Sequence, residues 1–192
     1  MTLFGVTRKF RDRAQSAHDT GQTLRTTILW WDEMSTETGT RTDIEESTNE
    51  WVGGVLAGIV GSIVMGALMV VQMRPVLEMA IPALYGIAGP AGAVGFTIHV
   101  VHGAIFGLVF AALLSLGQLR GYADAVGTSV GLGIGYGVVI WVVAAAILMP
   151  VLLSAVGFPG APPVGNFNTT SLVGHAVFGA VLGAVYPFVK DL

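Results

Sequence analysis

The chain contains no cysteine and carries very little charge along most of its length. The absence of cysteine among 192 residues excludes disulfides, iron–sulfur clusters, thiolate zinc sites and covalently attached c-type haem. Only 11% of the residues are charged, whereas soluble domains carry about a quarter. From Trp51 onward the charged residues are few: Arg74, Glu78, Arg120, Asp124, Lys190 and Asp191. This distribution argues against a soluble domain, and it separates a wet N-terminal segment from a lipid-embedded body.

Four long apolar runs follow Trp51, and none of them contains Asp, Glu, Lys or Arg. They are Val52–Met73, Phe96–Leu116, Val126–Val156 and Ser171–Val189. About 20 residues, each rising about 1.5 Å, cross a hydrocarbon core of about 30 Å. Barrel strands would alternate apolar and polar residues, and these runs do not. The sequence therefore predicts an all-α membrane protein with four transmembrane helices in residues 51–192, preceded by a wet segment in residues 1–50.

The connections between the runs differ in character. Residues 74–95 and 157–170 are rich in proline and glycine, and we interpret them as irregular interface segments, either ordinary packed loops or re-entrant ones. Gly117–Ala125 is short and polar, and Asp124 is placed to cap the third helix. With four spans, both termini and the connection Gly117–Ala125 lie on the same side of the membrane, and that side holds most of the Lys and Arg residues. This excess predicts a multi-pass cell-membrane protein with both termini in the cytoplasm.

The N-terminal segment divides into two parts. Leu3–Met34 has a heptad-like apolar stripe and predicts an amphipathic helix, while Ser35–Glu50 reads as an acidic linker. A basic cluster beside the stripe suits an anionic membrane surface: Arg8, Lys9, Arg11 and Arg13. A dimerising helix and a loosely ordered tail are the alternatives. The cluster is too short to predict a nucleic-acid partner.

The second and fourth runs share one phrase, H-x-x-x-G-x-x-x-G-x-V-aromatic. The matched pairs, all at one offset, include His99 and His175, Gly103 and Gly179, Gly107 and Gly183, and Phe110 and Tyr186. The first and third runs echo each other less strictly, with Gly54 and Gly58 set against Gly131 and Gly135. We predict two tandem, parallel two-helix repeats, about residues 52–116 and 126–189. Glycines spaced by four fall on one helix face, so these eight glycines are predicted to pack helices together.

Three histidines lie inside the runs, where ionisable side chains are rare and often functional. His99 and His175 are predicted at similar depth on equivalent helices, and His102 lies one turn from His99. One interpretation makes His99 and His175 the axial ligands of a b-type haem, with His102 as the spare candidate. The other makes them packing residues that need no cofactor. Three methionines spaced by four are interpreted as part of a packed face: Met65, Met69 and Met73.

The repeated phrase, the Gly-rich first run and its Met-rich end give the chain a family resemblance. Over about residues 51–189 it resembles small four-helix membrane proteins of unknown function, the YagU-like inner-membrane proteins and similar haloarchaeal proteins. The resemblance implies a four-helix bundle. It supplies no activity, substrate or catalytic residue.

The function predicted from these patterns is non-enzymatic. No nucleophile elbow, H-E-x-x-H motif, phosphate-binding loop or intramembrane carboxylate is present in the runs. Small-residue faces on all four helices favour a homo-oligomer or an accessory subunit of a larger membrane complex, with the lipid bilayer as the surrounding partner. A small permeation pathway and a haem-binding electron-transfer subunit are the alternatives.

Overall fold

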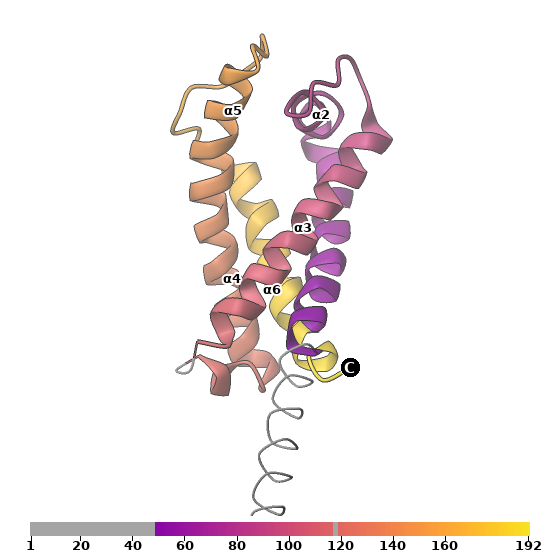
Figure 1. Ribbon diagram of the computed structural model, residues 1–192. Coiled ribbons are helices and arrows are strands. Elements are labelled where there is room, and N and C mark those ends of the chain that lie inside the picture. Colours follow the sequence, from indigo (N-terminus) through magenta and orange to yellow (C-terminus); the bar gives the residue numbers. More distant parts are fainter. Residues whose placement is uncertain (1–48, 117–118) are drawn as a thin grey trace, which may run out of the picture. The chain divides into compact units, whose positions relative to one another are not determined.

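The computed structural model describes residues 49–116 and 119–192 (Figure 1). The predicted N-terminal helix, its basic cluster and most of the linker lie outside these residues. Every regular element in the described part is a helix. Four helical segments are long and apolar enough to cross a membrane: Asn49–Gln72, Gly92–Leu114, Val126–Ala155 and Thr169–Val189. The prediction of four transmembrane helices is confirmed at this level, with boundaries a few residues from those expected.

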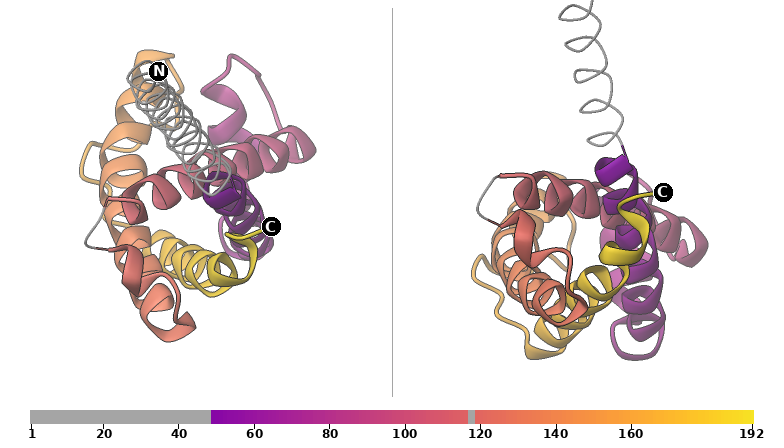
Figure 2. Two further views of the ribbon diagram at one scale, coloured as in Figure 1. Left: turned by 60° about the horizontal axis from the view of Figure 1, so that its bottom comes forward. Right: turned by 90° about the horizontal axis from the view of Figure 1, so that it is seen from below.

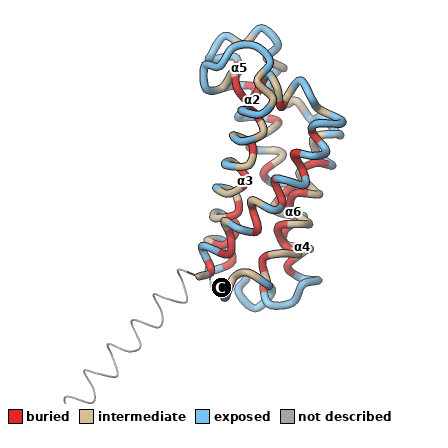
Figure 3. The backbone as a smooth tube through the Cα atoms, turned by 90° about the vertical axis from the view of Figure 1, so that its right-hand side faces the viewer, coloured by how far each residue is buried: buried red, intermediate tan, exposed pale blue. Residues whose placement is uncertain are grey.

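The spans form a ring in which neighbours run in opposite directions (Figures 1 and 2). The first span, Asn49–Gln72, is followed by α3 (Gly92–Leu114). The third span is continuous and comprises α4 (Val126–Ile140), η3 (Trp141–Leu148) and α5 (Met149–Ala155). The last span is α6 (Thr169–Val189). Buried positions follow the inner faces of the spans, whereas the outward faces carry exposed apolar side chains that suit lipid (Figure 3).

One end of the bundle, here called the terminal end, is tied together by ion pairs. Glu50, at the start of the first span, accepts a bond of 2.7 Å from Arg120 in the connection between α3 and α4. Lys190, after α6, lies 3.2 Å from Asp124 in that connection. Asp124 therefore pairs with Lys190, and the prediction that it caps the third helix is wrong: α4 begins after Ala125 without a side-chain cap. The opposite end, formed by the two long connections, is called the cavity end.

The first span and α3 cross at glycines. A Cβ atom added to Gly58 would lie 2.2 Å from the carbonyl oxygen of Gly103, and one added to Gly107 would lie 2.1 Å from that of Gly54. Both distances are far shorter than any real Cβ contact, so the two backbones approach as closely as they do only because side chains are missing. The predicted packing role of these four glycines is met in the structure.

The third span and α6 cross in the same manner, but not at all of the predicted positions. A Cβ on Gly133 would lie 2.1 Å from the Gly179 carbonyl oxygen, and one on Gly183 would lie 2.2 Å from the Ser129 carbonyl oxygen. Gly131 and Gly135, the predicted pair, have no atom within 4 Å of such a Cβ. The close contacts on α4 thus belong to the face that holds Ser129, Gly133 and Gly137, and the assignment of Gly131 and Gly135 to helix packing within this bundle is corrected.

Aromatic rings fill the space between the two helix pairs toward the terminal end. Phe110 of α3 lies 5.2 Å from the ring of Tyr136 on α4 and 5.7 Å, edge-on, from the ring of Tyr186 on α6. The Tyr136 hydroxyl donates to the Phe106 carbonyl at 2.7 Å. Leu182 is fully buried beside them. Three spans are therefore held together at this level by ring contacts and by the hydrogen bond of Tyr136.

A proline gives the third span its irregular middle. Pro150 has no N–H to donate to the Ala146 carbonyl, and the preceding Met149 N–H reaches back five residues to Ala144, which makes η3 a π-helix. The Ala146 carbonyl instead accepts the backbone N–H groups of Gly165 and Asn166, at 2.8 and 3.2 Å. The returning connection is therefore held against the span by the acceptor that the proline frees.

The first long connection repeats this device. η1 (Val76–Ala80) is another π-helical turn, and it leads into α2 (Ile81–Ala83), where Pro82 cannot bond to the Glu78 carbonyl. The Ala91 N–H donates to that carbonyl at 2.9 Å. Both long connections are packed against helix ends by backbone bonds. Whether either is re-entrant in the membrane stays a prediction.

Candidate cavity between the two helix pairs

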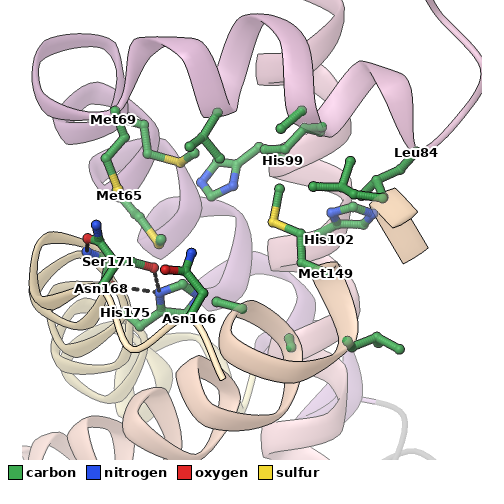
Figure 4. A pocket seen from close by; sticks show the side chains of 18 of the residues that line it. Met65, Met69, Leu84, His99, His102, Met149, Asn166, Asn168, Ser171 and His175 are labelled. Carbon is green, nitrogen blue, oxygen red and sulfur yellow. Dashed lines mark hydrogen bonds between the residues drawn. The ribbon is translucent and has the colours of Figure 1, made fainter. Parts of the chain in front are cut away.

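A cavity of about 940 Å³ lies between the two helix pairs toward the cavity end. Its walls come from the first span, η1, α2, α3, η3, α5, α6 and the second long connection (Figure 4). They continue to exposed residues such as Tyr85 and Asn168 at that end. None of the described residues that line it is Asp, Glu, Lys or Arg. Its size falls within the range of small-molecule pockets, and its chemistry comes from histidine, methionine, amide and hydroxyl groups.

His99 is held by the neighbouring span. Its Nε2 lies 3.1 Å from the Ser62 carbonyl oxygen, and since a carbonyl can only accept, Nε2 must carry the proton. Ser62 is fully buried, and its hydroxyl donates to the Ile59 carbonyl at 2.8 Å. His99 also lies beside Gly66, where a Cβ would approach its ring at 3.3 Å. The imidazole is thus fixed in one tautomer, which leaves Nδ1 with the free lone pair.

His175 is fixed the opposite way, by its own helix. Its Nδ1 lies 2.8 Å from the Ser171 carbonyl oxygen one turn earlier, so Nδ1 carries the proton and Nε2 has the lone pair. The first turn of α6 is itself capped by Asn168, whose side-chain oxygen accepts the Ser171 N–H at 2.9 Å. In Figure 4 His175 lies with Ser171, Asn168 and Asn166 on one side of the cavity. Together they form the most polar part of its wall.

His102 contacts a residue that the sequence did not single out. Its Nε2 lies 2.6 Å from the hydroxyl of Tyr85, which stands in the first long connection. The two rings lie 5.9 Å apart. No spacing in the sequence links Tyr85 to His102, because the pairing depends on how the connection folds back over α3. The bond joins the rim of the cavity to its wall.

The methionines gather at the same place. All five methionines that the structure describes line this cavity, as do all three described histidines: Met65, Met69, Met73, Met79 and Met149, with His99, His102 and His175. Met65 and Met69 are 5% and 3% exposed, so they do lie on a buried face as predicted, and that face also borders the cavity. Met65 and Met73 meet α6 at Gly174, where a Cβ would lie 3.3 and 3.6 Å from their terminal methyl carbons.

The structure therefore brings the predicted histidines onto one cavity, and of the eight predicted packing glycines only Gly103 borders it. No three side chains drawn from His, Cys, Asp and Glu are placed to hold a metal ion in the described part of the chain. The haem prediction meets one specific obstacle, because ligation of His99 through Nε2 requires its bond to Ser62 to break. Ligation by two histidines stays a prediction.

Comparisons of the chain with protein-family models, with curated proteins and with solved structures found no match.

Proposed function

We propose that this chain is a non-enzymatic integral membrane protein that binds a small ligand in the cavity between its two helix pairs. The observation that carries the proposal is the combination of a cavity of about 940 Å³ with a lining that holds no charged side chain among the described residues. A cavity lined by uncharged groups admits neutral or softly coordinated ligands and disfavours anions and hard cations. Three histidines, two asparagines and a tyrosine supply hydrogen bonds or lone pairs that would fix its orientation.

The lining also supports a binding role over a catalytic one. General acid–base and nucleophilic chemistry needs paired groups, such as a carboxylate beside a histidine or an activated serine or lysine. His99, His102 and His175 instead bond to a backbone carbonyl, a tyrosine hydroxyl and a backbone carbonyl. With termini in the cytoplasm, as the Lys and Arg distribution predicts, the cavity would face the outer side of the membrane.

A role as an oligomeric or accessory subunit is the second candidate, and one observation favours it. Gly127, Gly131 and Gly135 follow one another at a spacing of four on α4, and no atom of another described span lies within 4 Å of a Cβ at any of them. The glycines that pack the bundle itself are therefore not the ones available to a partner. Detergent-resolved sizing of Gly131→Leu against wild type tests this candidate, which predicts a smaller complex for the variant.

A tryptophan placed inside the cavity tests the binding proposal. Ala144 lines the cavity, whereas the adjacent Val143 is 55% exposed on the outer face. Native mass spectrometry of the purified protein should show a retained mass on the wild type and on Val143→Trp, and no such mass on Ala144→Trp. Equal retention by both variants, or no retained mass on any of the three proteins, would contradict the proposal. The visible spectrum of the same sample shows at once whether the retained mass is haem.

A further inference from the structure

The soft donor groups of this protein are concentrated in one place. Every described methionine and every described histidine borders the cavity, although many other residues do not. A packed hydrophobic core recruits leucine, isoleucine and valine at least as readily as methionine. Leucine, isoleucine and valine are common elsewhere on the four spans, so general apolarity does not explain why thioethers and imidazoles share this wall.

The donor set selects among ligands. Thioether sulfur is soft and polarisable, and together with imidazole nitrogen it suits Cu(I), whereas carboxylate and carbonyl oxygens suit Mg²⁺, Ca²⁺ and Mn²⁺. The lining residues include no carboxylate to balance charge. Because the cost of moving an ion into a poorly polar site grows with the square of its charge, a neutral donor set favours a monovalent ion over a divalent one.

Three donor residues lie close to Gly174 of α6. The terminal methyl carbons of Met65 and Met73 both approach Gly174, and His175 is the next residue along α6. The Nδ1–H of His175 is bonded to the Ser171 carbonyl, which is the outer bond that commonly orients a metal-binding imidazole and leaves Nε2 for the metal. Methionine has three rotatable side-chain bonds, so the two sulfur atoms can turn toward a common centre without moving the helices.

We propose that the ligand of the cavity is a soft monovalent metal ion, Cu(I), held by the thioethers of Met65 and Met73 and by Nε2 of His175. This proposal rests on the proposed binding function and specifies its ligand. The remaining described methionines and histidines line the same cavity. The first helix pair supplies the thioethers, and α6 supplies the imidazole.

The experiment titrates Cu(I) into the purified full-length protein under anaerobic, reducing conditions, in competition with a chromophoric Cu(I) chelator. The test variant is Met65→Leu with Met73→Leu, which keeps side-chain volume nearly constant. The matched control is Met79→Leu with Met149→Leu, which removes two thioethers elsewhere on the same cavity. X-ray absorption at the copper edge reports sulfur ligation directly.

We expect one Cu(I) per wild-type chain with sulfur in its coordination sphere, and more than about a tenfold loss of affinity in the test variant. The control variant should bind as the wild type does, and all three proteins should unfold at similar temperatures. Absence of Cu(I) binding by the wild type, or equal binding by the test and control variants, overturns the metal assignment. In that case, an organic mass retained by the wild type and absent from Ala144→Trp would leave the proposed binding function standing, and only the identity of the ligand would be wrong.

Discussion

Two glycines of α4, Gly133 and Gly135, lie on different faces of the helix, and we expect replacement by alanine to change the stability of the protein in opposite directions at the two sites. Gly133 lies against α6, where a Cβ would sit 2.1 Å from the Gly179 carbonyl oxygen, well short of the 3.4 Å at which ordinary contact begins. Gly135 has no neighbour within 4 Å. Replacement by alanine raises helix propensity by about 1 kcal/mol at either site, so that term cancels between the two variants. What remains is the overpacking cost at Gly133, about 1–3 kcal/mol.

We therefore expect Gly133→Ala to be less stable than Gly135→Ala by about 1–3 kcal/mol. Reversible unfolding in mixed micelles, driven by a rising fraction of sodium dodecyl sulfate and followed by far-ultraviolet circular dichroism, measures this difference. Gly58→Ala serves as the counterpart in the other crossing, because a Cβ there would lie 2.2 Å from the Gly103 carbonyl oxygen. Equal unfolding curves for Gly133→Ala and Gly135→Ala would refute the pairing of α4 with α6 through this face.

Two further predictions concern the ends of the bundle. Pro150→Ala restores an N–H that competes with the Gly165 amide for the Ala146 carbonyl. Mass spectrometry should therefore show faster hydrogen exchange at Gly165 in the variant, while other amides keep their rates. Unchanged exchange at Gly165 would show that the proline does not hold the connection in place. Partial burial lowers the pKa of Lys190, but its bonds to Asp191 and Asp124 outweigh this and leave the pKa above its ordinary value of 10.5. The stabilisation is thus complete below about pH 10.5 and is lost as the pH rises through the higher folded value. The stabilisation amounts to at most about 1 kcal/mol since Asp124 is exposed. Lys190→Met should reduce the difference in stability between pH 8 and pH 12, as read from unfolding curves at the two pH values. An unaltered difference would count against the ion pair.

Length and polarity were enough to predict the spans, because lipid forces apolar runs of about 20 residues into helices. The histidine phrase predicted packing at Gly103, Gly107, Gly179 and Gly183, and the structure places all four where two helices approach closely. Each of these two helices holds only one pair of glycines spaced by four. The tandem duplication itself, the parallel relation of the two copies and the family resemblance stay predictions.

The third span shows where sequence patterns were insufficient. It contains two interleaved glycine registers, one with Gly131 and Gly135 and one with Gly133 and Gly137. Both have the spacing that packs helices, so spacing alone could not choose the face. The structure places fully buried Ser129 in the second register, which continues the small-residue face toward the terminal end. The weaker sequence match had paired the first span with the other register.

The cavity was not predictable from sequence because it depends on a difference between the two helix pairs. Gly58 of the first span and Gly133 of the third occupy equivalent places in their helix crossings. Counted from these two glycines, Met65 corresponds to Ile140 and Met69 to Ala144. All four of these side chains line the cavity. The first span therefore carries a long thioether where the third span carries an alanine, and the side chains do not fill the space between the pairs. Native interiors rarely leave such space unless it is used. The described methionines and histidines border this space, so the difference between the two helix pairs, and not the shared phrase, accounts for the cavity.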